Sequence, residues 1–174
     1  MTQGTGSADG EPSDGGGDSP RLGAPVSVAP DPRIAVEIAA APAPDAGALS
    51  RWAAAALEAD DRAVCMRVVD EAEGAALNAR FRGGSGATNV LSFPAGESGL
   101  LGDIAICAPV VEAEARAQRK TLDAHFAHMV VHGVFHLRGL DHDDEVRAAR
   151  MEARESAVLH TLGFADPYAA TPAT

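Results

Sequence analysis

The sequence predicts an α+β fold, in which a small mixed sheet of four strands is packed with about five helices. Two observations carry this prediction. Short segments alternate apolar and polar residues as strands do, and longer segments carry apolar residues at helical spacing. The resulting order, βαβαββααα with short connections, is typical of helices packed on one small sheet. A chain of 174 residues suits a single domain of this kind.

The first half of the chain is expected to alternate strands and helices. Residues 34–38 and 63–69 have the alternation of strands. Asp45 can cap an alanine-rich helix that runs to about residue 59, and Asp70 can begin a second helix that runs to about residue 81. The glycine-rich residues 83–86 then predict a loop.

The second half is expected to hold two strands followed by three helices. Residues 89–94 form a strand that its final proline stops, and residues 102–107 form the next strand. Pro109 suits the first turn of a helix that reaches about residue 120. After a middle helix, Asp143 or Asp144 can cap the last helix, which ends near residue 162.

The two ends of the chain are expected to lie outside the folded body. Residues 1–32 are mostly Gly, Ser, Pro, Asp and Ala, which cannot bury enough surface to offset the entropy of ordering. We therefore expect a disordered acidic tail over 1–32, one folded domain over 33–166, and a frayed C-terminus over 167–174. The tail lacks the basic start and apolar stretch of a signal peptide, and no run predicts a membrane span.

Charge and cysteine content restrict the function classes. A net charge of −11 is unusual for a protein that binds nucleic acid, so any such binding must use a local basic group. Arg80 and Arg82 form one such group, and a second is Arg116, Arg119 and Lys120. Cys65 and Cys107 are expected to be small buried hydrophobic residues in a reducing compartment.

The helix expected over residues 122–138 carries the most informative motif. His132 and His136 lie one turn apart on the same helix face. Gly139 can adopt a left-handed conformation that ends the helix, after which His142 can turn back toward the first two imidazoles. Three neutral imidazoles that meet at one point form a zinc site with one position open for water, as catalytic zinc sites have.

Two other positions of this helix bear on the assignment. His128 shares the helix face of His132 and could compete as the third ligand, although a ligand from beyond the turn closes a tetrahedron better. Gly133 stands where zinc proteases of the HExxHxxGxxH type have their glutamate base. The motif therefore supports a metal and argues against peptide hydrolysis. His125 is expected to be a surface or packing residue, and His160 has no expected role.

Five segments, in this order and spacing, resemble the YbeY-type endoribonucleases of bacteria, which are rRNA maturation factors. The segments are Leu77-Asn-Ala-Arg-Phe-Arg82, Thr88-Asn-Val-Leu-Ser-Phe-Pro94, Gly102-Asp-Ile-Ala-Ile-Cys107, His128-Met-Val-Val-His-Gly-Val-Phe-His-Leu-Arg-Gly-Leu-Asp-His142 and Met151-Glu-x-x-Glu155. The resemblance extends from about residue 33 to 164. Phe81 departs from it, because tyrosine is common at that position, and so does Leu140.

The resemblance implies a site and a biological role. The family's three zinc ligands fall on His132, His136 and His142, which implies one zinc per chain, and its functional arginine falls on Arg82. The implied activity is metal-dependent cleavage of single-stranded RNA in 16S rRNA 3′-end maturation and ribosome quality control. The implied partners are the small ribosomal subunit, one of its proteins and a GTPase of assembly, in the cytoplasm.

Roles for several polar residues stay open at this stage. Arg82 can stabilise charge on a phosphate, or it can form a surface ion pair with Glu71 or Glu73. Asp141 can orient a metal-binding histidine from behind, or it can cap the turn. Asp103 is read as structural and Ser92 as a buried hydroxyl.

Three function classes follow from these readings. The favoured class is the endoribonuclease. A metal-dependent hydrolase of another substrate, such as a peptide, is disfavoured because the glutamate base is absent at Gly133. A zinc-stabilised assembly factor that binds the ribosome without cutting is compatible with the negative charge.

Overall fold

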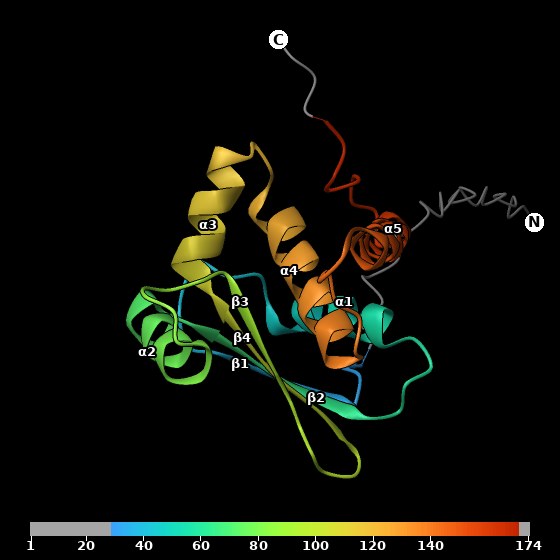
Figure 1. Cartoon of the computed structure of the whole chain (residues 1–174), viewed down its shortest axis with the longest axis horizontal. Helices are drawn as coiled ribbons and strands as arrows, with labels where there is room; N and C mark the ends of the chain where they lie inside the picture. Colours follow the sequence, from blue (N-terminus) through green and yellow to red (C-terminus); the bar gives the residue numbers. More distant parts are fainter. Residues whose placement is uncertain (1–28, 171–174) are drawn as a thin grey trace, which may run out of the picture.

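The computed structural model describes residues 29–170 and contains one four-stranded mixed sheet with five helices (Figure 1). The α+β fold expected from the sequence is confirmed. The strands are β1 (Ile34–Ile38), β2 (Ala63–Val69), β3 (Val90–Pro94) and β4 (Leu100–Cys107). The helices are α1 (Ala46–Leu57), α2 (Glu71–Arg82), α3 (Ala108–Ala117), α4 (Leu122–Leu137) and α5 (Glu145–Thr161).

The sheet has the strand order β1-β2-β4-β3. The first three strands in this order run parallel, and β3 pairs antiparallel with β4 at one edge. The crossover from β1 to β2 runs through α1, as parallel neighbours require. The edge strand β3 therefore has one side free of strand pairing among the described residues, and this side adjoins the candidate site.

Side-chain caps fix where most helices begin. The carboxylates of Asp45, Asp70 and Asp144 each accept a hydrogen bond from a backbone N–H in the first turn of their helix, as the sequence predicts. Thr121 caps α4 in the same way, with its hydroxyl oxygen 3.1 Å from the N of Ala124. α3 instead has a proline in its first turn and no side-chain cap.

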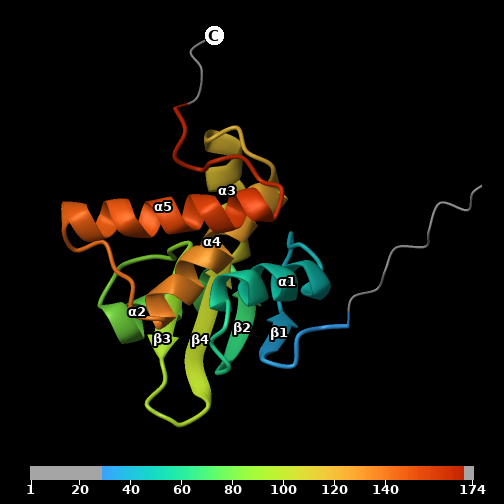
Figure 2. The ribbon, with the colours of Figure 1, turned by 90° about the vertical axis from the view of Figure 1, so that its right-hand side faces the viewer.

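The core lies between one face of the sheet and the helices α1 and α4. Alternate residues of β2, namely Val64, Met66 and Val68, are buried on this face. α4 is buried along most of its length because it packs against α1, α3, α5, β3 and β4. α5 lies across the outer side of α4 (Figure 2). The most buried helix of the molecule is therefore the one that carries the metal motif.

The two cysteines differ in their environment. Cys107 is buried, as expected, but Cys65 is exposed, so the expectation of burial is wrong for Cys65. The reason is the pleat of β2, which places Cys65 on the sheet face opposite the buried residues on either side of it. An apolar run in a strand thus did not reveal which face was covered.

At both ends of the described part, residues expected to lie outside the folded body form hydrogen bonds. Most of the expected tail, residues 1–28, lies outside the described residues. Beyond it, the carboxylate of Asp31 accepts hydrogen bonds from the backbone and side chain of Arg33. Fraying was expected from residue 167, yet Lys120 donates to the carbonyl of Pro167, and the Tyr168 hydroxyl reaches Glu155. Within the described part, no helix is long and apolar enough to cross a membrane.

Candidate metal centre

α4 places His132 and His136 side by side. The two rings lie with centroids 4.5 Å apart, and their Nε2 atoms are separated by 3.0 Å. Two imidazole nitrogens bound to one tetrahedral zinc ion, each at about 2.0–2.1 Å, are about 3.3 Å apart. The spacing in the helix therefore presents two nitrogens at nearly the separation that one ion requires.

The turn after α4 brings in His142. Gly139 has a φ of 87°, the left-handed conformation that glycine adopts without steric cost. The N–H of Gly139 donates to the carbonyl of His136, and the N–H of Leu140 donates to the carbonyl of Phe135, each at 3.0 Å. The chain thereby reverses, and the His142 ring centroid lies 5.0 Å from that of His136.

The three predicted histidines offer a donor set that fits zinc. One ligand nitrogen from each of His132, His136 and His142 lies within 4.8 Å of the other two. Burial lowers the pKa of His136, and the neighbouring His132 and His142 lower it further, which favours the neutral imidazole that binds metals. A set of three imidazoles with a cavity in front leaves room for a fourth, exchangeable ligand.

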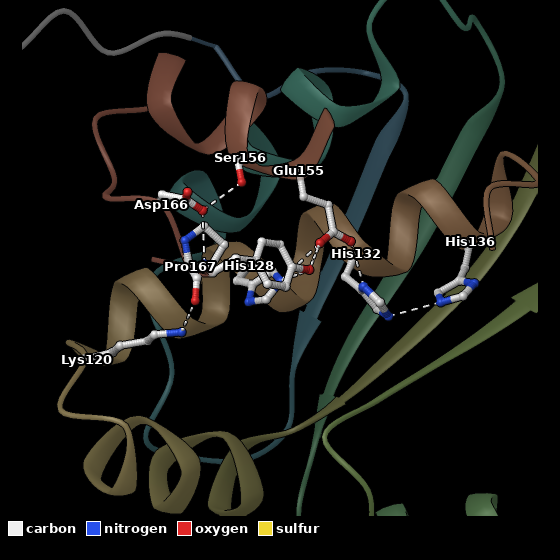
Figure 3. Close-up of polar contacts among 9 residues, drawn as sticks. Lys120, His128, His132, His136, Glu155, Ser156, Asp166 and Pro167 are labelled. Carbon is white, nitrogen blue, oxygen red and sulfur yellow. Dashed lines mark hydrogen bonds and ion pairs between the residues drawn. The ribbon is translucent and has the colours of Figure 1, made fainter. Parts of the chain in front are cut away.

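A buried carboxylate orients the first of these histidines. Glu155 extends from α5 to α4, and its Oε1 lies 2.6 Å from the Nδ1 of His132 (Figure 3). Because Glu155 is fully buried and ionised, Nδ1 is the donor and Nε2 keeps its lone pair for a metal. A carboxylate behind a ligating histidine fixes its tautomer and ring orientation in zinc proteins.

Glu155 has two further polar neighbours. The Nε2 of His128 lies 3.2 Å from Oε2, to which the Tyr168 hydroxyl also donates. Burial alone would raise the pKa of Glu155, but the hydrogen bonds from His128, His132 and Tyr168 outweigh it and lower the pKa to about 2. Burial, followed by the contact with Glu155, raises the pKa of Tyr168.

His128 is thus engaged away from the three-histidine cluster. His128, His132 and Glu155 form a second group whose ligand atoms lie within 4.8 Å of one another. In that group the facing atoms are already hydrogen-bonded in pairs, through the contacts with Glu155. His128 therefore lies with Glu155 and Tyr168, whereas His142 lies with His132 and His136.

Arg82 lies in the same cavity as the three histidines. This cavity, of about 430 Å³, is lined by Arg82, the three histidines and part of β3. The Nη2 of Arg82 donates to the carbonyl oxygen of Ser92 at 2.5 Å. The ion pair considered for Arg82 is not found among residues 29–170, because Glu73 pairs instead with Arg67, with Nε and Oε1 2.8 Å apart.

Asp141 does not have the orienting contact that was considered for it. Its carboxylate oxygens lie 3.3 Å from Nη1 of Arg147 and 3.4 Å from the backbone N of Asp143. Both contacts lie within the turn and the start of α5, as the capping alternative predicts. A carboxylate that does contact a histidine of the cluster belongs to Glu155, which is distant in sequence. Its only sequence signal was its place in the segment Met151-Glu-x-x-Glu155.

Gly133 has a packing reason to be glycine. A Cβ atom there would lie 3.2 Å from the side chain of Ile104 and 3.3 Å from the Oγ of Ser92. Ser92, buried as expected, donates to the carbonyl oxygen of Gly133 at 3.1 Å. A glutamate at this position would point into the sheet, so the base used by zinc proteases has no place here.

The remaining histidines lie apart from the cluster. His125 is buried, and its Nε2 lies 2.7 Å from the Oε2 of Glu114, which agrees with the packing alternative and not with the surface one. Burial lowers the pKa of His125, partly opposed by Glu114. His160 is exposed in the last turn of α5.

Comparison with known proteins identifies close relatives. A family model described as Endoribonuclease YbeY matches residues 45–163. Endoribonuclease YbeY of Methylococcus capsulatus is 53% identical over 130 residues, which are 72% of this chain and 87% of that protein. The Pseudomonas entomophila protein of the same name is 50% identical, over 74% of this chain and 87% of its own length.

Some relatives are longer than the matched region. Endoribonuclease YbeY of Azoarcus sp. is 51% identical over 74% of this chain, but the match covers 54% of that protein. The chain thus spans about half the length of this relative. The solution structure of TM1509 from Thermotoga maritima matches with a TM-score of 0.53 and 25% sequence identity, over 79% of this chain and 99% of that one.

Proposed function

Because the chain belongs to the Endoribonuclease YbeY family, we propose that it is a zinc-dependent endoribonuclease that cuts single-stranded RNA. In this proposal His132, His136 and His142 hold one zinc ion per chain. The observation that carries it is the meeting of three imidazole nitrogens within 4.8 Å, in a cavity that Arg82 also lines. The names of the relatives supply the substrate class.

Each group of the site has a distinct task in this proposal. When bound, zinc supplies Lewis-acid chemistry, since it acidifies water and stabilises negative charge on phosphate oxygens. Glu155 accepts a hydrogen bond from the Nδ1–H of His132, which would leave Nε2 free to bind the ion. The protein offers a second cation in Arg82, whose planar guanidinium can bind two phosphate oxygens as charge develops on them.

The biological role that we propose is maturation of the 3′ end of 16S rRNA and ribosome quality control in the cytoplasm. The proposed partners are the small ribosomal subunit, one of its proteins and a GTPase of assembly, as the family resemblance implies. The net charge of −11 disfavours broad RNA affinity, so partner proteins on the ribosome would have to bring the substrate to the site.

A cleavage assay with a matched inactive variant tests the proposal. The full chain and His136→Ala are purified in parallel, and elemental analysis measures the zinc in each. We expect the wild type to cut an unpaired RNA, to leave the corresponding duplex intact, and to stop when a chelator removes the metal. His136→Ala should contain little zinc and should not cut.

Two outcomes would contradict the proposal in different ways. Equal cutting by both proteins would show that the three-histidine cluster is not the source of the activity. Zinc-loaded wild type that binds RNA but never cuts it would instead favour the assembly factor, with which the acidic charge of the chain is compatible.

A further inference from the structure

An exposed phenylalanine lies next to the proposed active site. Phe81, in the last turn of α2, is 50% exposed, whereas the other four phenylalanines are buried or half-buried. Its only aromatic neighbour among the described residues is Phe93 of β3, whose ring meets it edge to face, with centroids 5.2 Å apart and planes at 64°. The two rings thus join the end of α2 to the edge strand β3, and the ribbons of these elements lie near one another in Figure 2.

Two guanidinium groups flank these rings. The Cζ of Arg80 lies 5.0 Å from the centroid of Phe81, and the Cζ of Arg82 lies 5.7 Å from that of Phe93. Within residues 29–170, neither arginine forms an ion pair with a carboxylate, although most other arginines of this acidic chain do. We call these four residues the aromatic patch. It combines exposed ring surface with uncompensated positive charge.

The aromatic patch is continuous with the metal cavity. Arg82 belongs to both, since its guanidinium lies over the ring of Phe93 and also lines the cavity of the three histidines. The two rings are therefore within reach of the neighbouring residues of a strand whose phosphate lies at Arg82. Exposed rings with neighbouring cations are the features by which proteins bind unpaired bases without strict sequence preference.

We propose that Phe81 is a stacking platform for an unpaired nucleobase next to the bond that is cut, with Arg80 on the adjoining phosphate. The proposal rests on the function proposed above, because it takes RNA as the ligand. The platform also accounts for a preference for single strands, since a base held in a duplex has both faces stacked and cannot lie flat on a protein ring.

Binding of an uncut RNA analogue tests the platform. The zinc-loaded chain is titrated with a short unpaired 2′-O-methyl RNA, and fluorescence anisotropy gives Kd. Loss of one base–aromatic stack should raise Kd of Phe81→Ala by about 5- to 150-fold. Phe81→Tyr should bind like the wild type because it keeps the ring. Val146→Ala is the matched control, since Val146 is an exposed apolar residue on α5.

Two further measurements separate stacking from charge. An oligomer of the same length that lacks bases should bind wild type and Phe81→Ala alike. Raising the salt concentration should weaken RNA binding by wild type and by Phe81→Ala with the same slope of log K against log salt. Arg80→Gln should reduce the magnitude of this slope by about 0.7. A melting curve for each variant shows whether the fold is kept.

The outcomes distinguish this proposal from the proposed function. If Phe81→Ala binds the analogue as tightly as the wild type while the wild type cuts RNA, the platform is wrong and the endoribonuclease stands. If Phe81→Ala binds weakly while the wild type never cuts, the platform stands and the chain binds RNA without cleaving it. If Phe81→Ala binds both the normal and the base-free oligomer more weakly than the wild type, the platform is also wrong, since this result would indicate a structural role for Phe81.

Discussion

Glu155 shows how one side chain can set the chemistry of another. It is fully buried, it accepts from the Nδ1 of His132, and its pKa of about 2 keeps it ionised at any pH at which the fold would work. An imidazole free to rotate could present either nitrogen to a metal. The carboxylate removes that freedom, so the Nε2 of His132 faces the other two histidines of the cluster.

Replacement of this carboxylate should weaken metal binding. We expect Glu155→Gln to raise the Kd for zinc by about 10- to 100-fold, because a neutral amide holds the His132 proton less strongly. Competition with a coloured chelator measures this Kd without reference to activity. Glu152→Gln is the control, since Glu152 is an exposed acid on the same helix with no hydrogen bond to the histidines. An equal loss of zinc affinity in both variants would indicate that the negative charge of α5 matters, and not the contact with His132.

Arg82 should affect cleavage without affecting the metal. A guanidinium stays protonated and has no lone pair for a metal, so Arg82→Ala should keep its zinc. If Arg82 stabilises charge on the phosphate, its loss should slow single-turnover cleavage by about tenfold to a thousandfold. Arg82→Lys should restore little, because a point charge lacks the two-pronged contact. A variant that melts early would instead assign Arg82 to structure, through its bond to the carbonyl of Ser92.

At the scale of helices and strands, the features that depend on neighbouring residues in the sequence could be predicted, and those that depend on distant residues could not. The bounds of β1 and β2 agree with the alternation of their residues, and the caps at Asp45 and Asp70 lie where the sequence places them. These features depend on neighbours in the chain. The strand order could not be predicted in the same way, because pairing joins residues far apart in sequence.

The candidate site likewise has a part that could be predicted from one stretch of sequence and a part that could not. The spacing within α4 and the glycine turn predicted three histidines that the structure brings together, since all lie in one short stretch. Glu155 was missed because its contact with His132 depends on how α5 crosses α4. The exposure of Cys65 was missed for a similar reason, since the helices cover one face of β2 and leave the other.

The contact between β4 and its neighbours gives a prediction for one glycine. A Cβ atom at Gly102 would lie 2.4 Å from the backbone oxygen of Phe93 and 2.6 Å from the side chain of Leu137. We expect Gly102→Ala to lower the free energy of unfolding by about 1–3 kcal/mol or more, as overpacking against backbone does. Gly96→Ala is the control, because nothing lies within 4 Å of its Cβ, and it should change stability by less than about 0.5 kcal/mol. Denaturant unfolding measures both, and equal stability of the two variants would mean that the strands separate easily.

At the scale of the whole molecule, core and site depend on the same helix. α4 packs against the sheet and three other helices, and it carries two of the three proposed ligands. Metal binding and folding should therefore stabilise each other, since a ligand that binds only the folded chain shifts the equilibrium toward it. The charge of −11 is a property of the chain as a whole, and the aromatic patch places two arginines beside the site in spite of it.

Removal of residues 1–28 should leave the folded domain and its candidate metal centre intact. The composition of residues 1–28 gives too little apolar surface to stabilise a core, so their deletion should change neither the melting temperature nor the zinc content. The deletion stops before Asp31, whose carboxylate holds Arg33. A fall of several degrees in melting temperature would show that the segment packs on the body.

The close approach at Gly133 also bears on how such sites can diverge. A single residue, glycine in place of glutamate at position 133, separates this sequence from the HExxHxxGxxH motif of zinc proteases. Glutamate at this position would nevertheless drive a side chain into Ile104 and Ser92, where a Cβ atom alone is already within 3.2–3.3 Å of both. A change of activity would first require α4 to move away from the sheet, which many core residues oppose. The close packing of α4 on the sheet therefore keeps glutamate out of position 133, although the three histidines of the two motifs are the same.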